Sequence, residues 1–164
     1  MSLFPDTNRG ALFSDCRRYR LSLWRFWGDG APLVFCGLNP STADEEKNDP
    51  TVERCERRAR AMGLGGLVVT NLFAFRATNP DDMKAQADPV GPGNDATLRI
   101  WSTLGPVLCG WGNHGTHLNR AATVRAMLKV PLYYLKLNNG GQPQHPLYVP
   151  YATQPTLWEV IDHG

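Results

Sequence analysis

Residues 33–40, LVFCGLNP, join a short and continuously apolar run to a polar turn. Such a run is typical of a strand that is covered on both faces, as in a parallel sheet. Similar runs are LVVT at residues 67–70, VLCGW at 107–111 and PLYYLKL at 131–137. Helical patterns separate these runs, so the sequence predicts an α/β domain: a three-layer α/β/α sandwich with a central, mostly parallel sheet.

Helix signals fill the segments between these strands. Asp49 is a predicted N-cap, Pro50 lies in the first turn, and Gly63 ends the pattern. The predicted helices are residues 50–62, 94–104, 117–129 and a terminal helix at 155–161. Residues 71–92 are predicted to be a long loop. The aromatic run at residues 19–27, YRLSLWRFW, is predicted to pair antiparallel at an edge of the sheet.

Length and composition indicate one soluble domain spanning residues 1–164. The chain is 42% hydrophobic and 20% charged with a net charge of +2, which neither supports nor excludes a nucleic-acid partner. We expect a polar N-terminal arm at residues 1–16 and a core at about 17–161. No run approaches the roughly 18 apolar residues of a membrane span, so we expect a cytoplasmic protein that does not contact membranes. We expect a monomer.

The four cysteines, Cys16, Cys36, Cys55 and Cys109, form no CxxC pair. Scattered spacing of this kind favours reduced and mostly buried thiols over a zinc or iron–sulfur site. His114 and His117 are three residues apart, but no third ligand follows at a useful spacing. We therefore expect neither a metal nor a cofactor.

Polar residues follow directly after the predicted strands. Asn39 follows the first strand, Asn71 the second and Asn113 the third, while His145 comes after the last strand and a glycine-rich turn. The carboxyl ends of parallel strands lie along one rim, where ligands bind in open α/β sheets. Amides and neutral imidazoles offer both donors and acceptors to a flat heterocycle. Each residue also has a simpler interpretation as a turn or cap residue.

The order of these motifs resembles the uracil-DNA glycosylase superfamily from about residue 33 to residue 148. GLNPS at 37–41 resembles the first motif of the mismatch-specific enzymes, which carry Asn where other members carry Asp. VVTNLFAFRA at 68–77 resembles the strand and loop that read the flipped base. VLCGWGNHG at 107–115 is similar to the strand before the last helix, and HPLY at 145–148 to the loop with the catalytic histidine. The chain also resembles, over nearly its full length, the domain-of-unknown-function family 1643.

The superfamily resemblance implies a base-flipping hydrolase that cleaves an N-glycosidic bond. His145 would donate a hydrogen bond to the leaving base, Asn39 would hold the attacking water, and Asn71 would read the base edge. The remaining implied residues are base-binding Phe73, Leu38 and Pro40, and nucleic-acid contacts Ser41, Thr42, Leu147 and Tyr148. The partner would be a nucleobase in DNA, or a free nucleoside or nucleotide.

Two features depart from that pattern. The acidic segment at residues 44–49 would repel a phosphate backbone, so a free nucleoside or nucleotide stays an alternative to DNA. The arginines at positions 54, 57, 58 and 60 are spread around their helix, which indicates mostly solvated surface. The alternative function is a catalytically silent nucleobase-binding or nucleic-acid-binding module on the same fold.

Overall fold

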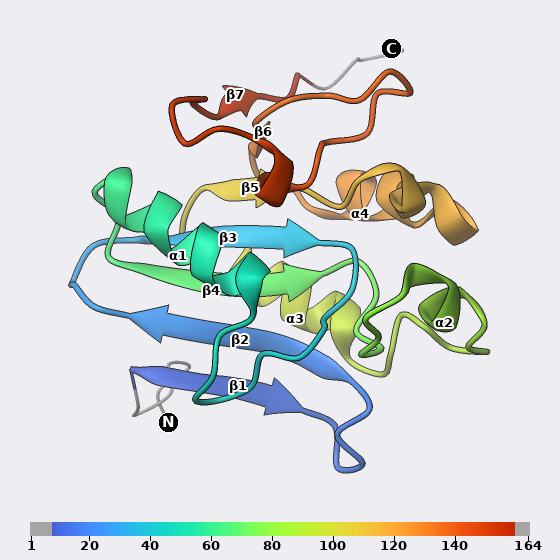
Figure 1. Ribbon diagram of the computed structural model, residues 1–164. Helices are drawn as coiled ribbons and strands as arrows, with labels where there is room; N and C mark the ends of the chain where they lie inside the picture. The colour runs from blue at the N-terminus through green and yellow to red at the C-terminus, as the bar shows by residue number, and fades with distance from the viewer. Residues whose placement is uncertain (1–7, 160–164) are drawn as a thin grey trace.

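Seven strands form a single sheet in the computed structural model, which describes residues 8–159 (Figure 1). The strands are β1 (Arg9–Phe13), β2 (Arg20–Phe26), β3 (Pro32–Gly37), β4 (Gly66–Asn71), β5 (Val107–Cys109), β6 (Leu132–Tyr134) and β7 (Thr156–Leu157). Their order across the sheet is β1-β2-β4-β3-β5-β6-β7. The four central strands β4, β3, β5 and β6 are parallel, which confirms the predicted centre of the sheet.

Helices lie on both faces of this sheet. They are α1 (Pro50–Ala61), α2 (Pro80–Lys84), α3 (Asn94–Trp101), η1 (Asn113–Asn119), α4 (Arg120–Met127) and η2 (Pro146–Tyr148), where η marks a 3₁₀ helix. Helix α1 begins at the predicted cap, because an Asp49 carboxylate oxygen accepts the Val52 N–H at 2.9 Å. Helices α3 and α4 lie on the opposite face from α1 (Figure 1).

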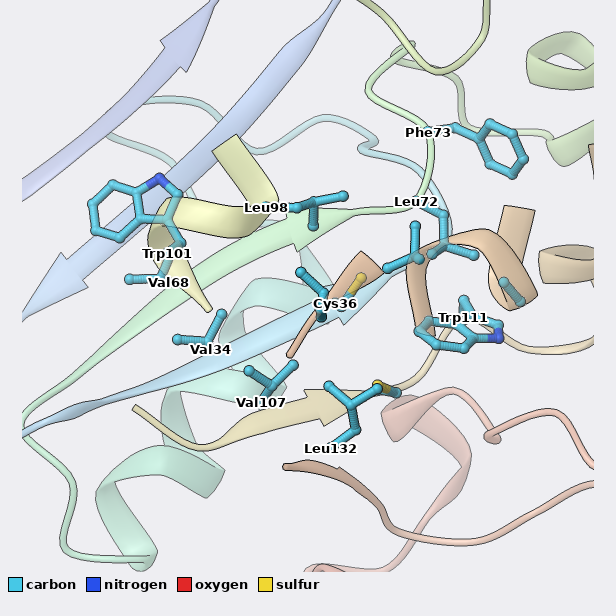
Figure 2. Close-up of a cluster of buried hydrophobic side chains, with 14 of the residues drawn as sticks. Val34, Cys36, Val68, Leu72, Phe73, Leu98, Trp101, Val107, Trp111 and Leu132 are labelled. Atoms are coloured by element: carbon cyan, nitrogen blue, oxygen red, sulfur yellow. The ribbon is translucent and has the colours of Figure 1, made fainter. Parts of the chain in front are cut away.

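Two apolar clusters separate the sheet from these helical layers. On the α1 side, Val52 and Cys55 pack with Leu33 and Phe35 of β3. On the other side, strand residues such as Val34 and Val68 face Leu98 of α3, as Figure 2 shows. Alternate residues of β3 thus enter opposite clusters, which is the period of two expected for a strand covered on both faces.

The predicted polar arm at residues 1–16 is wrong for residues 9–13, which form β1. This strand pairs antiparallel with β2 and replaces it at the edge of the sheet. Gly10 makes the pairing possible, because a Cβ there would lie 2.4 Å from the Trp24 ring. The run at 19–27 was correctly predicted to be antiparallel, since β2 pairs with β4 in that sense.

The predicted terminal helix at 155–161 is also wrong over its described part; residues 160 and 161 lie outside the described residues. Thr156 and Leu157 form β7, antiparallel to β6. The Trp158 ring packs against Trp111, with centroids 5.7 Å apart, and beneath the Arg125 guanidinium. These tertiary contacts and the unpaired edge of β6 outweigh a weak helical pattern.

Three loop boundaries also differ from the prediction. Asn79 caps the short helix α2 inside the predicted loop at 71–92. Helix α3 ends at Trp101 instead of residue 104. The helix expected from residue 117 starts only at Arg120, because Leu118 adopts a left-handed backbone with φ 54°.

The prediction of free and mostly buried thiols is confirmed: all four cysteines are free, and only Cys16 is exposed. Burial raises the pKa of both Cys36 and Cys55 to about 12, so these thiols stay protonated. Within the described residues, no helix is long and apolar enough to cross a membrane.

Candidate functional site

A cavity of about 590 Å³ opens at the carboxyl ends of the parallel strands. Gly37 lies at the end of β3, Asn71 at the end of β4, and Trp111 just beyond β5; all three line the cavity. From β3 the chain passes first to β4 on one side and later to β5 on the other. Such a reversal of strand order leaves a crevice at the strand ends, which is where open α/β sheets bind ligands.

Asn39 lies on the wall of the cavity formed by the turn after β3. Its side-chain Nδ2 donates to the carbonyl oxygens of Ala77, at 2.8 Å, and Pro40, at 3.2 Å. Both bonds use the amino group, so the Oδ1 atom remains as an acceptor for a ligand or a water. The amide thus joins two loops and holds one acceptor in a defined position.

Asn71 places a second amide deeper in the cavity. Its side-chain oxygen accepts from Nη2 of Arg20 at 3.5 Å, which leaves its Nδ2 as a donor. A Cβ at Gly37 would lie 3.0 Å from this Nδ2 atom, so glycine at that position makes room for the amide.

Arg20 brings a buried positive charge to the cavity wall. Its Nη1 donates to the Ala43 carbonyl at 3.1 Å, whereas its Nε is buried without a hydrogen-bond partner among residues 8–159. Burial lowers the pKa of Arg20 to about 10, and the nearby Asp49 opposes that shift. The guanidinium remains charged at neutral pH and favours electron-rich ligands.

Asp49 supplies the carboxylate among the described residues that line the cavity. Its Oδ1 accepts the Val52 N–H at 2.9 Å and its Oδ2 accepts the Ala43 N–H at 3.2 Å. Both oxygens therefore serve the cap of α1 and the loop before it. This position supports the cap interpretation of Asp49 and leaves its carboxylate poorly placed to act as a general base.

His145 faces the cavity from the segment between β6 and η2. Its Nδ1 accepts the Leu147 N–H at 3.2 Å, so the proton of the neutral ring lies on Nε2. Nε2 is 3.5 Å from the Thr51 hydroxyl. Burial lowers the pKa of His145, an effect that Asp49 partly offsets. The ring is therefore a neutral hydrogen-bond donor at physiological pH.

This lowered pKa predicts a pH-dependent loss of stability. Between the folded-state pKa and the ordinary value of about 6.5, the unfolded chain binds more protons than the folded chain. Stability should therefore fall as pH drops through 6.5 and level off below the folded-state pKa. His145→Gln should lack this component. Urea unfolding of both proteins from pH 7.5 to pH 5 tests it, and parallel pH profiles would contradict it.

Two arginines of α1 hold the segment that carries His145. Arg54 donates to the carbonyls of Pro146, at 3.0 Å, and Val149, at 2.5 Å. Arg58 donates to the carbonyls of Thr153, at 2.8 Å, and Pro150, at 3.1 Å. The interpretation of the helix arginines as solvated surface is therefore wrong for these two, since Arg58 is buried.

Most of the predicted site residues meet at this cavity. Those that line it are Leu38, Asn39, Pro40, Ser41, Asn71, His145, Leu147 and Tyr148. Thr42 does not line it. Phe73 is fully buried outside it, with its ring 5.6 Å from that of His117. Tyr148, with 74% of its surface exposed, is the most open large side chain at the rim.

Sequence reasoning missed the roles of Arg20 and Arg54. Arg20 is the first residue of β2, a strand rich in aromatic and aliphatic residues, and a charged residue beside such a run was the available signal. Arg54 and Arg58 are one helical turn apart, a spacing equally typical of solvated and of bonded arginines. Their carbonyl partners are more than 90 residues away in sequence, where no local pattern could reveal them.

No three His, Cys, Asp or Glu side chains come together in a metal-binding group within the part of the chain that the structure describes. A family model described as "Protein of unknown function (DUF1643)" matches residues 18–147. No curated protein and no solved structure matches the chain.

Proposed function

Since the chain belongs to the DUF1643 family of proteins of unknown function, we propose from its cavity that it is a glycosylase-like hydrolase acting on the N-glycosidic bond of a nucleobase. One observation carries this proposal. Asn39, Asn71 and His145 come from three distant segments and line one cavity of about 590 Å³. That volume falls within the usual range of small-ligand sites and accommodates a nucleoside.

Base recognition is assigned to Asn71. Its oriented Nδ2 is a donor for a carbonyl oxygen on the base edge, and Arg20 holds the amide in that orientation. The ring of Phe35, also at the cavity, adds an apolar surface beside the base. A buried amide of this kind discriminates strongly, because a wrong base leaves its donor unpaired.

His145 and Arg20 favour departure of the base. When the bond between C1′ and the base nitrogen breaks, its electron pair leaves with the base. The Nε2–H of a neutral His145 donates to the negative charge that develops, and the buried Arg20 guanidinium strengthens the same effect. Water then adds to C1′ and loses a proton to solvent, while the departing base anion takes up a proton from solvent, so cleavage yields the free base and a sugar with a hydroxyl group at C1′.

Asn39 is assigned the role of positioning the attacking water. Its Oδ1 can accept a hydrogen bond from that water, and its Nδ2 bonds hold the oxygen in place. An amide orients water without removing its proton, which suits a reaction whose sugar cation forms before attack. Asn39 therefore positions the nucleophile.

A catalytically silent base-binding module is the second candidate. The observation that favours it is the state of Asp49, whose two oxygens already accept backbone N–H groups. The cavity then offers recognition without a carboxylate to activate water. Turnover separates the two candidates.

The test is an incubation with oligonucleotides containing uracil, a thymine·guanine mismatch or hypoxanthine, and with the corresponding free nucleosides. Abasic sites and released bases are measured, together with binding. We expect base release from one of these substrates and a loss of about tenfold or more in Asn71→Ala, from the unpaired base edge. Thr123→Ala, on the exposed face of α4, is the matched control. Binding without release favours the silent module; neither binding nor release overturns both candidates.

A further inference from the structure

A second, smaller cavity of about 290 Å³ lies beside the first. The two share Ser41, Ala77 and Thr78 as wall residues, so the smaller cavity continues the larger one at the surface. Its other wall carries Arg17 and Arg18, from the turn between β1 and β2, and Arg76, from the loop after β4. We name this cavity the arginine groove.

The guanidinium of Arg18 has no partner in the groove. It is exposed and makes no hydrogen bond or ion pair with any residue that the structure describes. Arg76 uses Nε to bond the Ser41 carbonyl at 3.4 Å and Nη1 to bond the Arg17 carbonyl at 3.2 Å. These two bonds hold Arg76 against the wall shared with the main cavity, and its Nη2 remains as a donor.

An aromatic ring orders the other two guanidinium groups. Arg17 lies over the Phe13 ring at 3.9 Å, and Arg76 lies over the same ring at 4.8 Å. Like charges are thereby held on one small surface without the conformational freedom of ordinary surface arginines. This is the preorganised arrangement that arginines use to bind phosphate.

The acidic residues nearby leave this charge incompletely neutralised. Glu45 pairs with Arg17 through bonds of 2.6 and 3.0 Å. Asp44 accepts N–H groups of Glu46 and Lys47 within its own loop, at 2.9 and 2.8 Å. Arg18 and Arg76 therefore supply the available positive charge, and a ligand at Arg17 would compete with Glu45.

We propose that the arginine groove binds a phosphate group attached to the nucleoside that occupies the main cavity. The proposal rests on the proposed function, because it takes the main cavity as the base site. Arg18 and Arg76 hold the phosphate, and Ser41 lies at the passage between the two sites. The substrate is thus a nucleotide, and its phosphate belongs either to a nucleic-acid strand or to a free monophosphate.

The first arm of the test compares deoxynucleosides of uracil, thymine and hypoxanthine with their 5′-monophosphates by calorimetry. We expect the monophosphate to bind about fivefold more tightly, as one or two exposed charge-assisted hydrogen bonds would give. Arg18→Gln and Arg76→Gln should abolish that advantage while leaving nucleoside affinity unchanged. Arg99→Gln is the matched control, since it removes the same charge from α3, away from both cavities.

The second arm uses a labelled single-stranded 11-mer with a central tetrahydrofuran, which has phosphates but no base at that position. In wild type, log Kd should depend on log salt, and each arginine variant should reduce the slope by about 0.7. If the arginine variants change only the salt dependence of 11-mer binding, the phosphate belongs to a nucleic-acid strand. If they abolish the tighter binding of the monophosphates, it belongs to a free nucleotide.

Failure of the groove and failure of the proposed function give different results. If nucleosides bind but neither arm distinguishes Arg18→Gln and Arg76→Gln from Arg99→Gln, the groove proposal is overturned and the base site stands. If the arginine variants weaken binding of the 11-mer while no nucleoside binds and no base is released, the groove is a phosphate site but the proposed function fails, and the assignment of that phosphate to a nucleotide in the main cavity fails with it.

Discussion

Replacing His145 with alanine is expected to lower the rate of base release by about 10²-fold or more, the scale for loss of one donor to a developing negative charge. The donor in question is Nε2–H, because Nδ1 accepts the Leu147 N–H and therefore carries no proton. The effect should fall on kcat more than on KM, because the charge exists only as the base leaves. Single-turnover kinetics on the best substrate measure it.

Thr51→Val provides the control for this experiment. It removes the hydroxyl 3.5 Å from Nε2 and leaves the imidazole in place, so we expect less than a tenfold change. The rate of the wild type should also stay level down to pH 6.5, because burial lowers the pKa of His145. A His145→Ala protein that releases base at the wild-type rate would remove His145 from the mechanism.

The second large effect concerns stability. Phe73→Ala should destabilise the fold by about 3–5 kcal/mol, the usual result of truncating a buried aromatic ring. Phe73 has no exposed surface, and Figure 2 shows it beside Leu72 at the end of β4. Phe73→Leu retains much of the volume and should cost clearly less. Urea unfolding measures both values.

The same pair of variants tests the position of Phe73. If the Phe73 ring stacked on the base, the Phe73→Leu protein would bind nucleosides more weakly while its free energy of unfolding changed little. The structure predicts the reverse: reduced stability and unchanged nucleoside affinity in Phe73→Leu. A loss of nucleoside affinity in Phe73→Leu without a loss of stability would instead place the Phe73 ring in the cavity.

The centre of the fold was predictable because its signals are local. The β3 run is apolar at every position, and α1 carries its cap, its proline and its terminal glycine within one segment. The rim residues Asn39 and Asn71 were predictable for the same reason, since Asn71 is the last residue of β4 and Asn39 lies two residues after β3. Topology then brings them together through the parallel pairing of β3 with β4.

The edges of the sheet depend on contacts between distant residues. β1 forms because Gly10 lies under Trp24, and β7 forms beside β6 as Trp158 packs on Trp111. Neither contact leaves a periodic pattern in the strand itself. Burial of Phe73 was missed for a similar reason. The apolar stretch LFAF after a strand is equally typical of a loop that contacts a ligand and of a segment that packs into the core.

The bonds from Arg54 and Arg58 to the 146–153 segment have a consequence for motion. Four carbonyls of this segment, those of Pro146, Val149, Pro150 and Thr153, accept from these two side chains, and α1 also packs directly on η2. The wall that carries His145 therefore belongs to the same cooperative unit as α1. Thermal opening of that wall requires partial release of α1, so the His145 imidazole sits on a part of the cavity that opens together with the helix rather than on a separate lid.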